Sequence, residues 1–214
     1  MNNKNSLLLV DPEFDPQIAS DCTLLIRITT DSYSYAILNK KSTQLHVIFD
    51  HQECEDVIAE FTIRHQTDPY LLLPFSETKM SAYTGNSLFV PKDLFESNQL
   101  EYYKNCFRDE VPAVYTNPVD SYALQVVFAP EPYAEHKLDK LFPSVNKYEH
   151  TAPALSLSAE LPGNALVLDF TVSSCNIVFK KDERLIFSKH LEIEDTGELN
   201  YYLALLLKEL AIQP

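Results

Sequence analysis

Residues 24–38, LLIRITTDSYSYAIL, decide the fold of this chain. Two apolar runs flank the polar turn Thr29-Thr30-Asp31-Ser32, a pattern that is typical of a β-hairpin. A second turn at 39–42 leads into an apolar run at 45–49, so the sequence predicts a three-stranded meander. Apolar residues spaced three and four apart then predict a helix around 57–63. The continuous apolar run Tyr70 to Phe75 predicts a strand that is buried on both faces.

The same hydrophobic pattern occurs again 142 residues later, in 166–180, LVLDFTVSSCNIVFK. Few residues are identical, so the match rests on the spacing of apolar residues. The alternative is a chance similarity between two short meanders, which are common motifs. We expect the match to continue without a gap through the third strand and the helix, with the following pairs: Phe187 with Leu45, Leu191 with Phe49, Leu199 with Val57, Leu203 with Phe61 and Leu205 with Ile63.

The residues between the two repeats form an insertion of mixed structure. Gly85 lies between the runs Met80–Tyr83 and Ser87–Val90, which predicts a hairpin. The Pro162-Gly163 pair breaks the pattern, so we expect two domains: 1–162, a first half with the inserted hairpin and helices, and 163–214, a second half that is incomplete at its C-terminus. Four further elements are predicted in the insertion: a helical stretch over 94–107, a strand over 122–128, a helix over 134–142 and a linking helix over 154–161.

The composition excludes several classes of partner. The chain has 31 acidic and 17 basic side chains, a net charge of −14, which repels phosphate backbones and anionic lipids. We therefore expect neither nucleic acid nor membranes as partners. Four scattered cysteines without a CxxC pair indicate reduced thiols, and the apolar run Leu7 to Val10 is too short for a signal peptide. These features predict a soluble, cytoplasmic protein.

The sequence shows no catalytic constellation. The 6 histidines lie in separate segments, and no serine lies in a Gly-x-Ser-x-Gly turn. His51 and Cys54 are close enough for half a metal site, but no second ligand pair lies nearby in the sequence. We therefore predict no catalytic residue and no metal ligand.

Two copies of strand, strand, strand, helix and parallel strand, joined by a helical link, resemble the layout of the actin, hexokinase and heat-shock chaperone ATPase superfamily. The whole chain also resembles a bacterial family of uncharacterised function whose members are described as having an actin-like ATPase fold. The resemblance spans all 214 residues. It implies an α/β fold, mixed α+β in detail, of two ribonuclease H-like βββαβ halves, the second apparently truncated.

In that superfamily ATP lies between the halves, and the first hairpin turn of each half faces the phosphates. An aspartate ends the first strand, and glycines let backbone N–H groups approach the phosphate oxygens. In this chain Arg27 and Thr29 occupy the aspartate and glycine positions of the first turn. Asp169 occupies the aspartate position of the second turn, but Phe170 to Ser173 supply no glycine. The chain has only 3 glycines, so we do not expect ATP and magnesium as cofactors.

If a nucleotide binds, its ligands are side chains rather than backbone amides. The alternative is that these side chains are ordinary hydrophilic residues of hairpin tips. The resemblance implies five such ligands, which would face one another across the cleft: Thr29, Asp31, Asp169, Ser173 and Ser174.

The sequence leaves three functions open. We expect a non-catalytic actin-like scaffold that binds a protein partner through acidic surfaces or a sheet edge. The alternatives are a divergent nucleotide-binding ATPase or kinase-like enzyme and a regulatory module that binds a small metabolite. The strand that should follow the second helix is missing before Pro214. That difference indicates either a shortened chain or a sheet edge that a partner covers.

Overall fold

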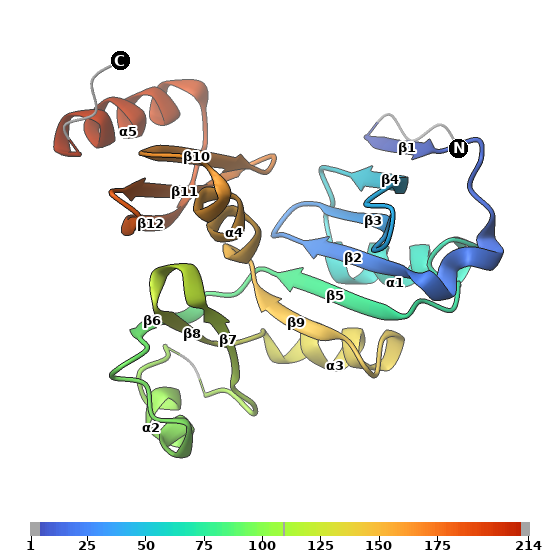
Figure 1. Ribbon diagram of the computed structural model, residues 1–214, viewed down its shortest axis with the longest axis horizontal. Coiled ribbons are helices and arrows are strands. Elements are labelled where there is room, and N and C mark those ends of the chain that lie inside the picture. Colours follow the sequence, from blue (N-terminus) through green and yellow to red (C-terminus); the bar gives the residue numbers. More distant parts are fainter. Residues whose placement is uncertain (1–4, 109, 211–214) are drawn as a thin grey trace.

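The computed structural model describes residues 5–108 and 110–210. The sequence predicts that the second half ends at Ile212 to Pro214 without the matching strand, and these three residues lie outside the described ranges. The described strands form three sheets, in the orders β1-β4-β3-β2-β5-β9, β6-β8-β7 and β10-β11-β12 (Figure 1). We call them the six-stranded, the middle and the C-terminal sheet.

The six-stranded sheet contains the first predicted meander. Its strands are β1 (Ser6–Val10), β2 (Cys22–Ile28), β3 (Tyr33–Asn39), β4 (Leu45–His51), β5 (Glu77–Ala82) and β9 (Asn146–Glu149).

Two helices complete the core of this part. They are α1 (Val57–Thr67) and α3 (Pro132–Leu141), and they pack against the buried face of the sheet. Alternate residues of β2, such as Leu24 and Ile26, point into this core. Phe61 of α1 stacks on Phe142 with 6.2 Å between ring centroids.

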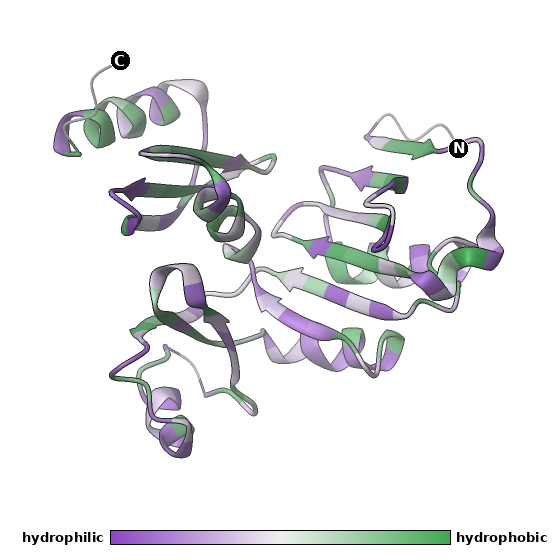
Figure 2. Ribbon diagram, viewed as in Figure 1, coloured by the Kyte–Doolittle hydropathy of each residue, from purple (hydrophilic) through white to green (hydrophobic). Residues whose placement is uncertain are grey.

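The C-terminal sheet contains the second predicted meander. Its strands are β10 (Ala165–Phe170), β11 (Ser174–Lys181) and β12 (Arg184–Glu192), followed by α5 (Thr196–Glu209). The linking helix α4 (Ala152–Glu160) packs on this sheet, where Leu155 contacts Val167 and Val178. Helix α4 and strand β10 are largely hydrophobic (Figure 2), so their contact forms a second, smaller core.

The two meanders have the same register, 142 residues apart. Ile28 pairs with Tyr33 beside the first turn, and Phe170 pairs with Cys175 beside the second. The register also shifts directly after Ile37 in β3 and directly after Phe179 in β11. The shared hydrophobic pattern therefore corresponds to a shared pattern of strand pairing.

The predicted gapless match is wrong beyond this shift. Phe187 takes the place of Val47, not of Leu45, because the connection into β12 is shorter than the connection into β4. The N-caps of the following helices, Asp56 and Asp195, are also fewer than 142 residues apart. The predicted pairs in the third strand and the helix are therefore displaced.

The apolar run Tyr70 to Phe75 is not the predicted strand. It is irregular, with Leu71 buried and Leu72 exposed, and the parallel strand follows it as β5. Pro74 has no N–H group to donate to a strand ladder. The pairing with β2 therefore begins only after this proline.

The predicted hairpin around Gly85 is also wrong. Strand β5 pairs with β2 on one side and β9 on the other, so it has no free edge for β6 (Asn86–Pro91). Strand β6 pairs instead with β8 (Leu124–Ala129) in the middle sheet. Residues Tyr83 to Gly85 therefore connect two sheets.

The other predicted elements are found with changed bounds. Strand β8 and helices α3 and α4 lie within a few residues of their predicted ranges, whereas the stretch 94–107 contains only the short helix α2 (Leu100–Lys104). Strands β1, β7 (Tyr115–Val119) and β9 were not predicted. Strand β7 contains Pro118, which is tolerated because β7 is an edge strand of its sheet.

Candidate functional site

The two hairpin turns have the same hydrogen-bonding geometry. The N–H of Thr29 donates to the carbonyl of Ser32, and the N–H of Thr171 donates to the carbonyl of Ser174, both at 2.9 Å. In return, the N–H of each serine donates to the hydroxyl of its threonine at 3.0 Å. Thr29 and Ser174, two of the five predicted ligands, thus form hydrogen bonds within their own turns.

The turns also contact each other. One carboxylate oxygen of Asp31 accepts the N–H of Ser173 at 2.7 Å and also the Ser173 hydroxyl. Burial opposes the ionisation of Asp31, but the hydrogen bonds from Ser173 outweigh it and hold the pKa of this carboxyl below its ordinary value. Asp31 is therefore an ionised anchor between the two turns.

A salt bridge joins the strands that lead into the turns. Arg27 Nη2 donates to Asp169 Oδ2 at 2.8 Å, and the Asn176 side-chain amide donates to the same oxygen at 3.1 Å. The two charged side chains are 30% and 20% exposed. Arg27 and Asp169 are 142 residues apart and occupy equivalent positions of the two meanders. The salt bridge therefore joins equivalent positions of the two meanders.

The structure therefore brings all five predicted residues to one place. None of them faces its counterpart across an open cleft, because the turns are hydrogen-bonded directly to each other. None of the residues in either turn has a positive φ, the backbone conformation that a glycine-rich phosphate nest uses. The five predicted residues do not include Arg27 and Asn176, which bind Asp169.

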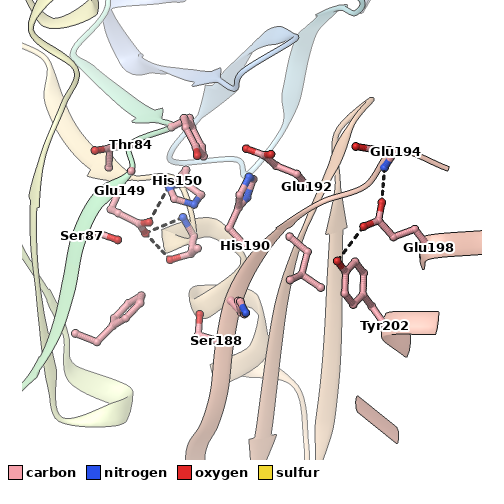
Figure 3. A pocket seen from close by; sticks show the side chains of 16 residues that line it. Thr84, Ser87, Glu149, His150, Ser188, His190, Glu192, Glu194, Glu198 and Tyr202 are labelled. Carbon is pink, nitrogen blue, oxygen red and sulfur yellow. Dashed lines mark hydrogen bonds and ion pairs between the residues drawn. The ribbon is translucent and has the colours of Figure 1, made fainter. Parts of the chain in front are cut away.

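A cavity of about 580 Å³ lies beside this contact (Figure 3). Glu149, His150 and His190 point toward one another in its centre, while Glu198 and Tyr202 line another part of it. The cavity is connected to the salt bridge through Asn176, whose Oδ1 lies 2.8 Å from His190 Nδ1. The salt bridge and the cavity therefore share one hydrogen-bonded network.

The network assigns the tautomer of His190. The Asn176 amide nitrogen donates to Asp169, so its oxygen is the atom that faces His190. We therefore assign the His190 proton to Nδ1. The remaining nitrogen, Nε2, is buried without a hydrogen-bond partner. Burial, together with the nearby His150, lowers the pKa of His190, which agrees with a neutral ring.

Glu149 is buried at the centre of the cavity wall with 1% exposure. Burial raises the cost of its charge, but His150 and Thr151 outweigh this and lower the pKa of Glu149. The Thr151 N–H donates to Glu149 Oε2 at 2.8 Å. His150 Nδ1 lies 2.8 Å from its other oxygen, an ion-pair distance without hydrogen-bond geometry. Three further polar atoms of side chains that line the cavity are buried without a hydrogen-bond partner: His150 Nε2, Ser188 Oγ and His190 Nε2.

Sequence reasoning did not find this group. His150 follows β9 and His190 lies in β12, and 40 residues separate them, so no spacing signal connects them. The structure packs the two rings with centroids 5.1 Å apart, and Tyr83 contacts both.

The buried His190 predicts a loss of stability in mild acid. Its folded-state pKa is below the unfolded value of about 6.5, so the unfolded chain binds the proton more readily. Stability is therefore lost as the pH falls through about 6.5 toward the folded-state pKa. We expect His190→Gln to reduce the loss in urea midpoint between about pH 7 and about pH 5.

The exposed His136 provides the control for this prediction. His136→Gln should retain the wild-type pH dependence, and His65, whose pKa burial also lowers, is unchanged in both variants. The groups that act on the His190 charge are His150, which disfavours it, and Glu149, Glu192 and Asp31, which favour it. An unchanged pH dependence in His190→Gln would contradict the assignment of a buried, neutral ring.

Comparisons with known proteins agree on the fold. A Bacteroides thetaiotaomicron protein, described as having an actin-like ATPase fold and unknown function, matches with a TM-score of 0.78 and 18% identity over 94% of this chain and 81% of its own. At this identity the likeness shows the fold alone, so this chain has the actin-like ATPase fold. No curated protein matches the sequence.

Two further solved structures are more distant. The ethanolamine utilization protein EutJ from Carboxydothermus hydrogenoformans has a TM-score of 0.45 at 11% identity, over 94% of this chain and 60% of its own. An Aquifex aeolicus Ppx/GppA phosphatase has a TM-score of 0.39 at 15% identity, over 88% of this chain and 62% of its own. This chain thus spans less than two thirds of either protein.

None of the helices in the described ranges, 5–108 and 110–210, combines the length and the apolar character required to cross a membrane.

The strongest sequence-level assignment comes from a family model that matches residues 11–214. This chain belongs to the family described as protein of unknown function (DUF3822).

Proposed function

We propose that this protein is a non-catalytic member of the actin-like ATPase fold that binds a protein partner. The observation that carries the proposal is the direct contact between the two hairpin turns. The resemblance to the ATPase superfamily implies that nucleotide phosphates would lie between these turns, and in this chain the turns are hydrogen-bonded to each other.

The groups that could hold a phosphate or magnesium are already bound to each other. Asp169 accepts from Arg27 and Asn176, and Asp31 accepts from Ser173. Charge-assisted hydrogen bonds of this kind are among the stronger ones in proteins. A phosphate would have to break them and would also meet the ionised Asp31 carboxylate, which repels it. No backbone nest in these turns compensates for that cost.

The edge strand β1 supports a protein partner. It pairs with β4 on one side only, and the side chains of Leu7 to Val10 are exposed. An unpaired strand edge with apolar side chains can accept a strand from another chain. The net charge of −14 favours a partner with a basic surface.

Calorimetry with ATP and magnesium tests the proposal. We expect no saturable binding up to about 1 mM nucleotide, because the turns are closed by their own hydrogen bonds. Asp169→Ala should behave as the wild type in this titration.

Asp93→Ala is the matched control, since Asp93 is exposed and far from the turns in sequence. Micromolar binding that is lost in Asp169→Ala and kept in Asp93→Ala would refute the proposal. That result would support the alternative function, a divergent nucleotide-binding ATPase or kinase-like enzyme. Thermal unfolding of each variant should accompany the titration, so that loss of binding is not confused with loss of fold.

A further inference from the structure

Three side chains with metal-binding chemistry meet beside the first turn. His51 ends β4, Cys54 lies in the loop after it, and Glu60 lies in the first turns of α1. One ligand atom of each, an imidazole nitrogen, the thiol sulfur and a carboxylate oxygen, lie within 4.8 Å of one another. His51 Nε2 and Glu60 Oε2 are 3.0 Å apart, which is close to the spacing of two ligands that share one metal ion at about 2.1 Å from each.

Outer partners orient two of these ligands. The Ser6 hydroxyl lies 2.6 Å from His51 Nδ1, which leaves Nε2 facing Glu60. The Glu55 N–H donates to Glu60 Oε1 at 2.9 Å, so Oε2 is the oxygen that faces the histidine. Hydrogen bonds that hold the far side of a histidine or carboxylate are typical of metal ligands.

The charges around the cluster favour a cation. Residues 50–60 contain five acidic side chains and no lysine or arginine. Burial and the nearby Glu60 and Asp31 raise the pKa of Cys54 to about 12. A divalent cation would offset the surrounding negative charge and would favour the thiolate, the form that binds metals.

We propose that His51, Cys54 and Glu60 bind one zinc ion, with water as the fourth ligand. A set of one nitrogen, one sulfur and one oxygen suits zinc, whereas calcium and magnesium prefer oxygen alone. On binding, the neutral imidazole carries its single proton on Nδ1, directed at Ser6 Oγ, so that Nε2 can coordinate the ion together with the Glu60 carboxylate. The Cys54 thiol releases its proton to solvent as the zinc–sulfur bond forms.

The zinc ion has a structural consequence. The Cys54 N–H donates to the carbonyl of Asp31 at 2.9 Å, so a metal at Cys54 would hold the loop against the first hairpin turn. The inference goes beyond the proposed function and does not depend on it, since it concerns a cluster within the first half of the chain.

Cobalt titration of the full chain tests the zinc site. Reduced, chelator-treated protein is titrated with Co²⁺, and we expect a thiolate-to-cobalt charge-transfer absorption that saturates at about one equivalent and is removed by zinc. Cys54→Ser should abolish this absorption and weaken zinc binding by more than about tenfold, the loss that even outer partners of a metal site cause.

Two further variants keep the test decisive. Cys106→Ser removes an exposed thiol elsewhere and should leave the absorption unchanged. Glu60→Gln retains an oxygen for the Glu55 N–H but removes the charged ligand, so it should weaken zinc binding even if Cys54→Ser folds poorly. No absorption in the wild type, equal absorption in Cys54→Ser, or equal zinc affinity in Glu60→Gln would overturn the proposal.

Discussion

Replacing Asp68 with alanine is expected to lower the free energy of unfolding by about 3–4 kcal/mol. Asp68 is 2% exposed. Its Oδ2 accepts the Tyr35 hydroxyl at 2.6 Å and Arg64 Nε at 2.7 Å, and its Oδ1 accepts the Tyr70 N–H at 2.9 Å. Burial and the neighbouring Asp68 raise the pKa of Tyr35, so its hydroxyl remains a donor. Alanine would leave this buried donor without an acceptor.

One variant separates the hydrogen bonds of Asp68 from its charge, and a second provides a control at an exposed aspartate. Asp68→Asn keeps an oxygen for Tyr35, and Arg64 is 31% exposed and can reach water, so we expect a smaller loss of about 1–2 kcal/mol. Asp93→Ala, at an exposed position, should change the free energy by less than about 0.5 kcal/mol. Urea unfolding followed by circular dichroism measures all three. Equal losses for the alanine and asparagine variants would contradict the account.

Exchanging the charges of Arg27 and Asp169 is expected to preserve most of the stability that either single reversal loses. Arg27→Asp places two carboxylates together, and Asp169→Arg places two guanidinium groups together. Because the pair is only partly exposed, each single reversal should cost about 2 kcal/mol. The double variant restores opposite charges at positions that the two meanders share.

The neighbours of the pair limit how complete the recovery is. Asn176 donates to Asp169 in the wild type, and the equivalent position in the first meander is Ser34, the register partner of Arg27. A hydroxyl at Ser34 can donate to a carboxylate at 27, so we expect recovery of more than half of the loss. A double variant as unstable as the sum of the singles would show that the two positions do not interact. The measurement is urea unfolding of the four proteins.

The contact between the turns was predictable only in part. The repeat equates Arg27 with Asp169 and Asp31 with Ser173, and the superfamily resemblance places both turns at the interface of the halves. Nothing in the spacing shows that equivalent residues touch, since this depends on how the two meanders pack against each other. The resemblance therefore implied ligands that face one another across a cleft, whereas the structure shows hydrogen bonds between the turns.

The contacts within the proposed zinc site and within the cavity were also not predictable from the sequence alone. His51 and Cys54 are close in sequence, but Glu60 joins them only because the first turns of α1 pack back toward the end of β4. His150 and His190 meet because β9 and β12 belong to different sheets that end beside each other. Contacts of this kind depend on packing between distant segments.

The sequence by itself determined the two hairpins of this protein, although not all of its other local elements. Apolar runs and polar turns specified both hairpins, and the absence of glycine in the turns argued against a phosphate nest, because these properties depend on neighbouring residues. Only the tertiary structure decided that Arg27 binds Asp169, that β5 pairs with β2 instead of β6, and that buried polar atoms line a cavity. These contacts join residues far apart in the chain, and they form because packing brings their strands together.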